Sequence, residues 1–305
     1  MVVGELLLDL LGPILESIAP HLPGEWFPRF FSRSYLQRSL IAALVVSMVA
    51  GFLGSFLLIR NLALVGDGLA HVSYGAIGIF IVIGIIDPLD GAYVVCVIAA
   101  VLIDLAQRYG WLTGDTAIAI ISTGMLGLGL VLFKLYGGTS LVTIDTYLWA
   151  DLITMSDELY QRIVFISVIC YLGLLLLYRS LLAICIDPVA ARIQGIPVEV
   201  ISLCWSILVG LVVVSMVQIV GALLVTALLV TPAAIAQITS RSFFSGVVLS
   251  QIYGILTILL GLYYSAELGT GTGSMIALVS AVLFVIVVIS KSLVRLLTTA
   301  NQNTS

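Results

Sequence analysis

The sequence predicts an all-α membrane protein, built as a polytopic bundle of about nine transmembrane helices. Hydrophobic residues occupy 61% of the 305 positions, and the mean hydropathy is +1.25. Charged residues occupy only 9%, whereas soluble domains hold about a quarter. At about 20 residues per crossing, the apolar positions suffice for roughly nine spans, and an isolated segment in lipid satisfies its backbone only as a helix. This composition excludes a soluble enzyme, a disordered scaffold and a nucleic-acid-binding protein.

The first segment, residues 1–37, is predicted to be amphipathic and to lie at the membrane interface. Three acidic residues and a glycine recur at helical spacing and mark one face: Glu5, Asp9, Gly12 and Glu16. Leucine and isoleucine cover the rest of this helix, which ends at Pro20. Trp26 and Phe27 then suit the depth of the lipid headgroups. The alternative is a dispensable tail packed loosely on the bundle.

The second segment, residues 38–295, holds the predicted spans, and residues 296–305 are a short polar tail. The apolar runs are residues 39–59, 68–86, 90–107, 116–136, 162–182, 199–218, 220–239, 244–264 and 274–290. The second and seventh runs have the least distinct boundaries.

Basic residues predict the orientation of the spans, because Lys and Arg favour cytoplasmic loops. If the nine runs cross in alternation, one side receives Arg60, Arg108, Arg179, Arg192, Arg241, Lys291 and Arg295. The other side receives only Lys134 and Arg162 from loops between spans, so the first side is assigned to the cytoplasm. Arg29, Arg33 and Arg38 precede the first run and then lie outside, against this rule. Either the N-terminal segment is an exception or one of the runs does not cross.

The same alternation gathers carboxylates on the external side: Asp87, Asp90, Asp145, Asp151, Asp157, Glu158 and Glu267. Together they could form a vestibule whose negative potential concentrates cations. The alternative is that external loops simply carry charge to remain soluble.

A carboxylate and an imidazole lie one helical turn apart at the edge of the second run. Asp67 and His71 stand at positions i and i+4, so a helix places both on one face. A carboxylate inside the membrane costs on the order of 3 kcal/mol, so the pair is expected to face an ion, water or a partner. Both groups are ligands of divalent transition metals. We therefore predict a metal pathway at this pair; the alternative is an Asp–His hydrogen bond that only fixes the helix.

Two ligands do not complete a tetrahedral metal site, which suits a pathway because a transported ion must be released. Further contacts are expected from water or from four polar residues: Asp151, Gln218, Gln237 and Glu267. The two glutamines fit hydrogen bonding between helices equally well.

A loop with distinct start and stop signals, residues 187–198, joins two spans on the predicted cytoplasmic side. Asp187 can cap a helix whose first residue is Pro188, and Gly195 ends this helix before Pro197. The candidate contact residues of this short helix are Asp187, Pro188, Ala191, Arg192, Gly195 and Pro197. The helix could dock into a cleft of a partner; the alternative is a well-ordered loop.

Three motifs, in this order along the chain, resemble the membrane subunit of ABC importers for divalent metals, the zinc, manganese and iron family. Residues 66–71 are similar to the family's Gly-Asp-x-x-(Ser/Ala)-His. Residues 187–197 resemble its Asp-Pro-x-x-Ala-x-x-x-Gly-(Leu/Ile)-Pro loop, and residues 221–234 its Gly-x-Leu-Leu-Val-x-Ala-Leu-Leu-x-x-Pro-Ala-Ala helix. With weaker similarities, the match covers about residues 38–290. Tyr74-Gly75-Ala76 departs from the family, which often has Leu-Pro-Gly there.

The resemblance implies a type II importer-like permease in the cell membrane, with two copies around a central pathway. It also implies two cytoplasmic ATP-binding subunits docked on residues 187–198, and an extracytoplasmic metal-binding protein that delivers the ion. The chain contains no Gly-x-x-x-x-Gly-Lys-(Ser/Thr) loop, so ATP hydrolysis is expected in another subunit and the chain itself is not expected to be an enzyme. No permanently bound cofactor is expected.

The expected function is ATP-driven import of a divalent metal by alternating access past Asp67 and His71. The motif is closest to zinc-type members, so zinc is the expected metal, with manganese or iron as the alternative. An alternative of another class is a proton-coupled secondary transporter or channel that uses the same two residues as a proton relay.

Overall fold

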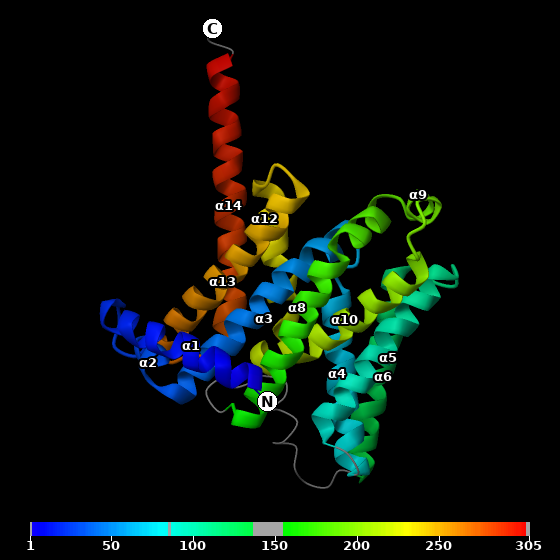
Figure 1. The fold of residues 1–305 in the computed structure, drawn as a ribbon, viewed down its shortest axis with the longest axis horizontal. Helices are drawn as coiled ribbons and strands as arrows, with labels where there is room; N and C mark the ends of the chain where they lie inside the picture. The colour runs from blue at the N-terminus through cyan, green and yellow to red at the C-terminus, as the bar shows by residue number, and fades with distance from the viewer. Residues whose placement is uncertain (1, 85–86, 137–154, 303–305) are drawn as a thin grey trace.

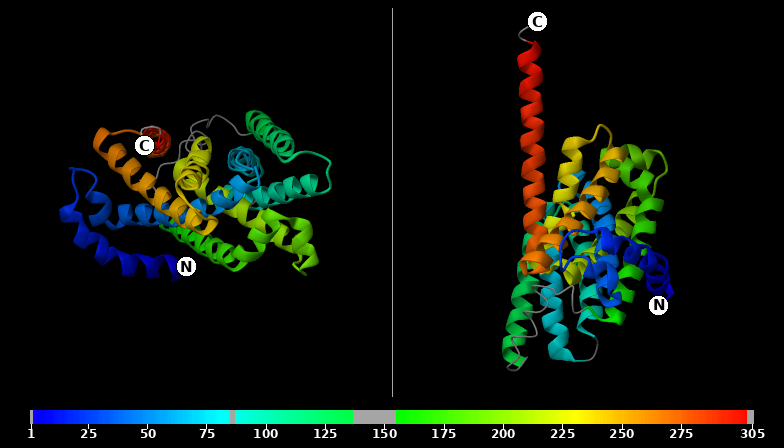
Figure 2. Two further views of the ribbon diagram at one scale, coloured as in Figure 1. Left: turned by 90° about the horizontal axis from the view of Figure 1, so that it is seen from above. Right: turned by 90° about the vertical axis from the view of Figure 1, so that its left-hand side faces the viewer.

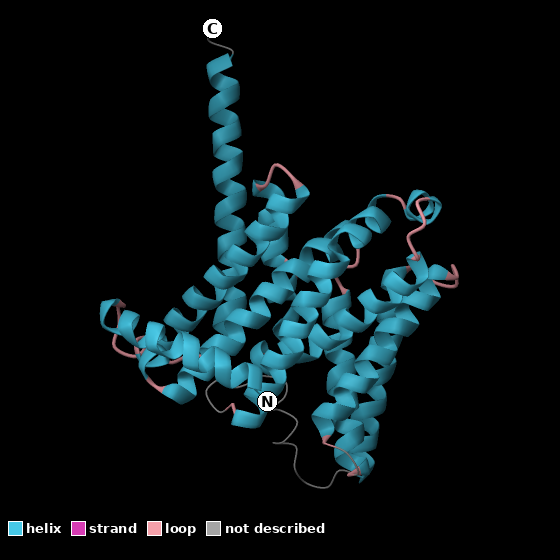
Figure 3. Cartoon of the chain, viewed as in Figure 1, coloured by secondary structure: helices cyan, strands magenta, loops and turns pink. Residues whose placement is uncertain are grey.

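The computed structural model describes residues 2–84, 87–136 and 155–302, and every regular element within them is helical (Figure 1, Figure 3). The all-α prediction is confirmed. In chain order the elements are α1 Val2–Ile18, η1 Ala19–His21, α2 Arg29–Ser32, α3 Ser34–Ile59, α4 Val65–Ile83, α5 Pro88–Arg108, α6 Gly114–Tyr136, α8 Asp157–Ile186, α9 Pro188–Ile193, α10 Val198–Val220, η3 Ala222–Leu224, α11 Val225–Leu229, α12 Thr231–Thr239, α13 Phe243–Leu268 and α14 Thr272–Gln302.

Eight of the described helices are long and apolar enough to cross a membrane: α3, α4, α5, α6, α8, α10, α13 and α14. They correspond to eight of the nine predicted runs. Helices α3 and α10 are largely enclosed by other helices, whereas α6, α8 and α14 expose most of their apolar surface. Figure 2 shows α14 projecting well beyond the other helices at its C-terminal end. This helix continues to Gln302, into the predicted polar tail.

The remaining run, residues 220–239, differs from the prediction because it is not one continuous helix. It is divided into η3, α11 and α12. The first break is at Gly221, whose φ of +86° is open to glycine and strained for other residues. The second precedes Pro232, which lies in the first turn of α12, where its missing N–H is tolerated.

The broken segment nevertheless crosses most of the membrane, as its contacts with α14 demonstrate. Three contacts join partners 53 positions apart: Val220 with Gly273, Ala227 with Ser280, and Ile238 with Lys291. Between Gly273 and Lys291, a helix rises about 27 Å at 1.5 Å per residue, close to the thickness of a hydrocarbon core. The chain therefore crosses once more between α10 and α13, and the alternation of sides is preserved.

Polar contacts divide the bundle into the two ends that the charge pattern predicts. At one end, Arg162 of α8 lies 2.7 Å from Asp90 and 3.8 Å from Asp87, at the start of α5. At the other end, Ser202 of α10 donates a 2.8 Å hydrogen bond to Asp104, near the end of α5. The first end is the predicted external side, and the second is the predicted cytoplasmic side.

The N-terminal segment packs on the predicted external end. Helix α1 lies against α8 and α3, and the buried hydroxyl of Tyr160 donates to the carbonyl oxygen of Gly4 at 2.9 Å. Its outer side exposes an apolar row at helical spacing: Leu6, Leu10, Ile14 and Ile18. Among the three external arginines, Arg38 forms an ion pair with Asp157. The amphipathic helix therefore exists, and its position at the lipid interface stays a prediction.

Close backbone packing joins α4 to α6. A Cβ at Gly75 would meet the carbonyl oxygen of Met125 at 2.2 Å, and one at Gly129 would meet the backbone of Gly75 at 2.5 Å. Only glycine allows this approach. Helix α4 runs unbroken through Tyr74-Gly75-Ala76, the position at which the sequence departs from the family motif.

Candidate functional site

Asp67 and His71 lie on one face of α4, as their spacing predicts. The helix starts at Val65, after a tight turn in which Asn61 has a φ of +55°, a conformation that asparagine tolerates. The Nε2 atom of His71 lies 3.6 Å from Oδ2 of Asp67. This separation exceeds the 2.7–3.2 Å of a normal hydrogen bond, so the two side chains do not simply fix each other.

The pair is open on an otherwise buried part of α4. The side chain of Asp67 is 42% exposed and that of His71 is 28% exposed, while nearly all of the helix between Val65 and Gly78 is buried. Helix α6 flanks this part of α4, where Gly68 packs against Ile118. The open face is therefore a gap in the packing of a single chain.

The depth of the pair follows from the opposite flank of α4. A Cβ at Gly66 would meet the side chain of Leu229 at 2.6 Å. Leu229 lies midway along the segment from Val220 to Ile238, which crosses the membrane beside α14. Asp67 and His71 therefore lie in the first two turns of α4, level with the middle of the segment that runs beside α14.

A carboxylate at this depth does not face lipid without cost, which is about 3 kcal/mol on insertion scales. The open face must therefore be covered by water, by an ion or by another protein surface. Within the described residues, no third His, Cys, Asp or Glu side chain joins the pair to form a metal-binding cluster. The described residues of one chain therefore offer two candidate ligands at this face.

Among the described contacts, none joins Gln218, Gln237 or Glu267 to this pair. Gln218 is buried near the end of α10, at 9% exposure, and its Nε2 has no hydrogen-bond partner among the described residues. Glu267 lies near the end of α13, where its Oε1 accepts hydrogen bonds from the N–H groups of Trp26 and Phe27 at 2.9 and 3.0 Å. Asp151, like Asp145, is outside the described residues.

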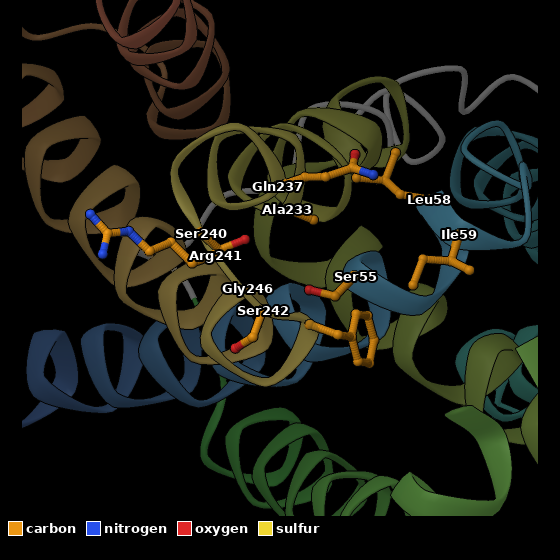
Figure 4. A pocket seen from close by; sticks show the side chains of 10 residues that line it. Ser55, Leu58, Ile59, Ala233, Gln237, Ser240, Arg241, Ser242 and Gly246 are labelled. Carbon is orange, nitrogen blue, oxygen red and sulfur yellow. The ribbon is translucent and has the colours of Figure 1, made fainter. Parts of the chain in front are cut away.

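Gln237 borders a separate cavity of about 270 Å³, at the predicted cytoplasmic ends of α3, α12 and α13 (Figure 4). Ser55 faces this cavity from α3, and its hydroxyl also bonds to Ser250 at 3.0 Å. In Figure 4 the guanidinium of Arg241 extends away from both residues. The cavity is a polar recess on the predicted exit side, with no contact to Asp67 or His71 among those described.

The predicted docking helix is α9, and its ends are built as the sequence indicates. Oδ1 of Asp187 accepts hydrogen bonds from the N–H groups of Val189 and Ala190, at 2.8 and 3.0 Å. After the helix, Gly195 adopts a φ of +84°. Ala191 is buried against the bundle, whereas Val189 and Ile193 are exposed. The predicted cap and stop are confirmed. Helix α9 lies at the periphery of the bundle (Figure 1), and its exposed side chains give it an apolar edge.

A polar cluster that the sequence analysis missed lies beside α9, along a groove of about 500 Å³. Arg60, after α3, donates to the hydroxyl of Ser202 at 3.4 Å, and Ser202 donates to Asp104. Asp104 also forms an ion pair with Arg108, one turn further along α5. Burial lowers the pKa of the Arg60 guanidinium, although it stays charged. The available signal was Asp104, an acidic residue inside a predicted span.

This cluster joins three parts of the fold. It connects α10, which follows the docking helix, with the end of α5 and with the turn that leads into α4. Arg60 is seven residues before Asp67 in the sequence. The predicted cytoplasmic end of the bundle therefore links α10, which follows α9, to the helix that carries the Asp67–His71 pair.

The ABC 3 transport family model matches residues 32–291. The chain belongs to the ABC 3 transport family. This assignment confirms the resemblance carried by residues 66–71, 187–197 and 221–234, and it identifies a multi-pass permease of the cell membrane.

Two similar proteins from bacteria have names that specify a metal. The manganese import system permease protein ScaB of Streptococcus parasanguinis is 33% identical over 254 residues, which cover 83% of this chain and 89% of the relative. The manganese transport system membrane protein MntC of Halalkalibacterium halodurans is 32% identical over 259 residues, covering 85% and 88%. Both names specify manganese, so the expected preference for zinc finds no support among these relatives.

Solved structures share the permease fold. PsaBC from Streptococcus pneumoniae in complex with Fab superposes with a TM-score of 0.73 at 30% identity, covering 83% of this chain and 90% of the other. An inward-facing transporter described as metal-chelate type ABC gives a TM-score of 0.69 at 19% identity, covering 93% and 97%. The second likeness concerns the fold alone.

Proposed function

We propose that this ABC 3 family permease moves manganese into the cell by alternating access, driven by ATP hydrolysis in a separate subunit. The observation that carries the proposal is the Asp67–His71 pair, which is open within an otherwise buried part of the membrane helix α4. A permanent binding site would enclose its metal with further protein ligands. Two ligands on an open face suit an ion that arrives and leaves.

Manganese is favoured by ligand chemistry as well as by the names of the relatives. Carboxylate and water oxygens suit Mn²⁺, while sites rich in thiolate or imidazole favour zinc. The pair offers one carboxylate and one imidazole, and none of the described cysteines or histidines adds to it. Iron of the same charge is the alternative within the family.

A second copy of the chain is proposed to cover the open face. Asp67 and His71 are partly exposed at a depth where lipid would otherwise meet a carboxylate. Two permeases that face each other across this surface would contribute two such pairs to one pathway. The metal would come from an extracytoplasmic binding protein on the predicted external side.

The ATP-binding subunit is proposed to dock on α9. Val189 and Ile193 form the exposed apolar edge of this helix, and the chain has no phosphate-binding loop of its own. Motion of the docked helix would pass through Ser202 and Arg60 to the turn before α4. In this way the nucleotide state would open or close the path past Asp67.

The test is manganese uptake by proteoliposomes that contain the complete transporter. We expect Asp67→Asn and His71→Ala each to reduce uptake at least about tenfold, because each substitution removes one good metal contact. The subunits should still co-purify. Asp9→Asn and His21→Ala are the controls, because Asp9 and His21 are exposed on the N-terminal segment and His21 is the only other histidine. Normal uptake by both site variants would refute the pathway role.

Two further measurements separate the alternatives. Competition by zinc and by ferrous iron tests the metal: equal or better zinc uptake would overturn the manganese assignment. Uptake without ATP, driven by a proton gradient across the same liposomes, would instead support the proton-coupled carrier.

A further inference from the structure

A cavity of about 350 Å³ lies between the N-terminal segment and the turn that joins α13 to α14, on the predicted external side. The N-terminal segment contributes two arginines and aromatic residues to its lining. The opposite wall consists of Ser265 and Ala266 of α13 and of Thr270 and Thr272 in the turn. None of the residues lining the cavity is acidic.

The two arginines, Arg29 and Arg33, are the ones whose external position opposes the positive-inside rule. Neither forms an ion pair with a carboxylate among the described residues, in contrast to Arg38, which pairs with Asp157. The guanidinium of Arg29 stacks over the ring of Trp26 at 3.8 Å. Arg33 donates to the hydroxyl of Tyr35 at 3.3 Å. Each guanidinium has five N–H groups, so both keep free donors for an anion.

Two carboxylates lie close to this pair, and neither lines the cavity. Glu25 directly precedes Trp26 and is exposed, and Glu267 interacts electrostatically with Arg29. Glu267 lies beside the cavity on α13, and its Oε1 is engaged by the N–H groups of Trp26 and Phe27. Its charge therefore fastens the N-terminal segment to α13. The charged side chains that line the cavity itself are therefore the two guanidinium groups.

The surroundings of the cavity are apolar and face lipid. Phe30 and Leu36 form part of its floor and are buried. Next to it on α13, Tyr264 and Leu268 are exposed, as is Trp26 at the rim. Exposed aromatic and apolar side chains at the end of a membrane span mark the depth of the lipid headgroups. An occupant would therefore have an anionic head and an apolar body.

We propose that this cavity binds the phosphate headgroup of an anionic phospholipid in the external leaflet. Arg29 and Arg33 would hold the phosphate through charge-assisted hydrogen bonds, and Tyr35 and Thr270 would offer hydroxyl groups to the glycerol part. The acyl chains would then lie along Tyr264 and Leu268. The lipid would join the N-terminal segment to the α13–α14 turn. A role as lipid ligands would explain why Arg29 and Arg33 lie on the predicted external side, against the positive-inside rule.

A zwitterionic lipid fits less well, because its ammonium group would enter a cavity that already holds two guanidinium groups. A free phosphate ion would satisfy the arginines and leave the apolar rim exposed. A protein partner with an acidic surface could contact the exposed Arg33, whereas Arg29 is stacked on the ring of Trp26. The experiment treats the zwitterionic lipid and the free phosphate ion as distinct outcomes.

The test measures lipid binding to the complete transporter purified in detergent, by native mass spectrometry and by the shift of its melting temperature. Phosphatidylglycerol, phosphatidylcholine and inorganic phosphate are added separately. We expect phosphatidylglycerol alone to bind and to raise the melting temperature. In the variant Arg29→Gln/Arg33→Gln, the Kd for phosphatidylglycerol should rise at least about tenfold, because at least one charge-assisted hydrogen bond is lost.

The control variant is Arg179→Gln/Arg241→Gln, which removes the same charge from exposed arginines on the predicted cytoplasmic side. It should bind phosphatidylglycerol as the wild type does. Arg33→Gln alone is the second variant, because Arg33 is exposed and its substitution leaves the core intact. An equal effect of phosphate, of phosphatidylcholine or of the control substitutions would overturn the proposal. Unchanged binding by both Arg33 variants would overturn it too.

Discussion

The hydroxyl of Ser280 on α14 donates a 2.8 Å hydrogen bond to the backbone carbonyl oxygen of Ala227 on α11. Helix α11 has only five residues, and the last four carbonyls of any helix lack partners within it. In the membrane interior these oxygens have no water to bond. The broken crossing segment therefore depends on side chains of α14 for its backbone hydrogen bonds.

We predict that Ser280→Ala destabilises the transporter by about 1–3 kcal/mol, because it leaves the carbonyl oxygen of Ala227 buried and unpaired. Thermal unfolding of the purified protein in detergent measures the effect. Ser290→Ala is the matched control, since Ser290 is exposed on the same helix and bonds only to Ile286 of its own turn. Equal melting temperatures for the two variants would show that α11 does not need this bond.

The packing of α4 on α6 gives a second prediction. A methyl group at Gly75 would meet the carbonyl oxygen of Met125 at 2.2 Å, so Gly75→Ala must push the two helices apart. We expect a loss of about 1–3 kcal/mol in stability and a lower rate of uptake, because α4 carries Asp67 and His71. Gly124→Ala is the control, as nothing lies within 4 Å of a Cβ there on α6. If Gly75→Ala matched this control in both measurements, the close approach would not matter.

Local patterns in the sequence predicted much of this molecule. Runs of apolar residues located eight membrane helices, because each run is long enough to span the bilayer by itself. The spacing of Asp67 and His71 predicted a shared helical face, and Asp187 with Gly195 predicted the ends of α9. Each of these features depends on residues close together in the chain.

Features that depend on distant contacts could not be predicted. The level of Asp67 beside the broken segment follows from the packing of Gly66 on Leu229, more than 160 positions away. The external arginine Arg38 is paired with Asp157, which no local pattern relates to it. The breaks in residues 220–239 lie within an apolar run that looks continuous, since hydropathy does not report where α14 supplies hydrogen bonds.

The cap of the docking helix gives a third prediction. Asp187→Ala removes the acceptor for the N–H groups of Val189 and Ala190, which costs about 1 kcal/mol of helix stability. We expect the ATP-binding subunit to bind this variant roughly fivefold more weakly, because about 1 kcal/mol corresponds to that change in affinity. Asp187→Asn keeps a capping oxygen and should bind nearly as the wild type does. Affinity of the detergent-purified permease for its ATP-binding subunit is the measurement. Were the Asn variant as weak as the Ala variant, charge rather than capping would be the property that matters.

The cluster beside the docking helix gives the last prediction. Arg60 bonds to Ser202 on α10, and the turn that follows Arg60 leads into α4, so this contact lies between the docked subunit and the proposed pathway. If it transmits motion, Arg60→Gln should leave subunit binding unchanged and lower the manganese transported per ATP hydrolysed. Residues on a coupling path typically change coupling roughly 2- to 30-fold.

The measurement compares uptake with ATP hydrolysis in the same proteoliposomes, so that a smaller amount of active protein affects both equally. Ser202→Ala should reproduce the effect of Arg60→Gln, because it removes the other partner of the contact. Combining the two substitutions should add little, since they break one interaction. Arg179→Gln, an exposed arginine on the same predicted side, should keep the wild-type ratio. An unchanged ratio in the Arg60 and Ser202 variants would mean that the docking helix moves α4 by another route.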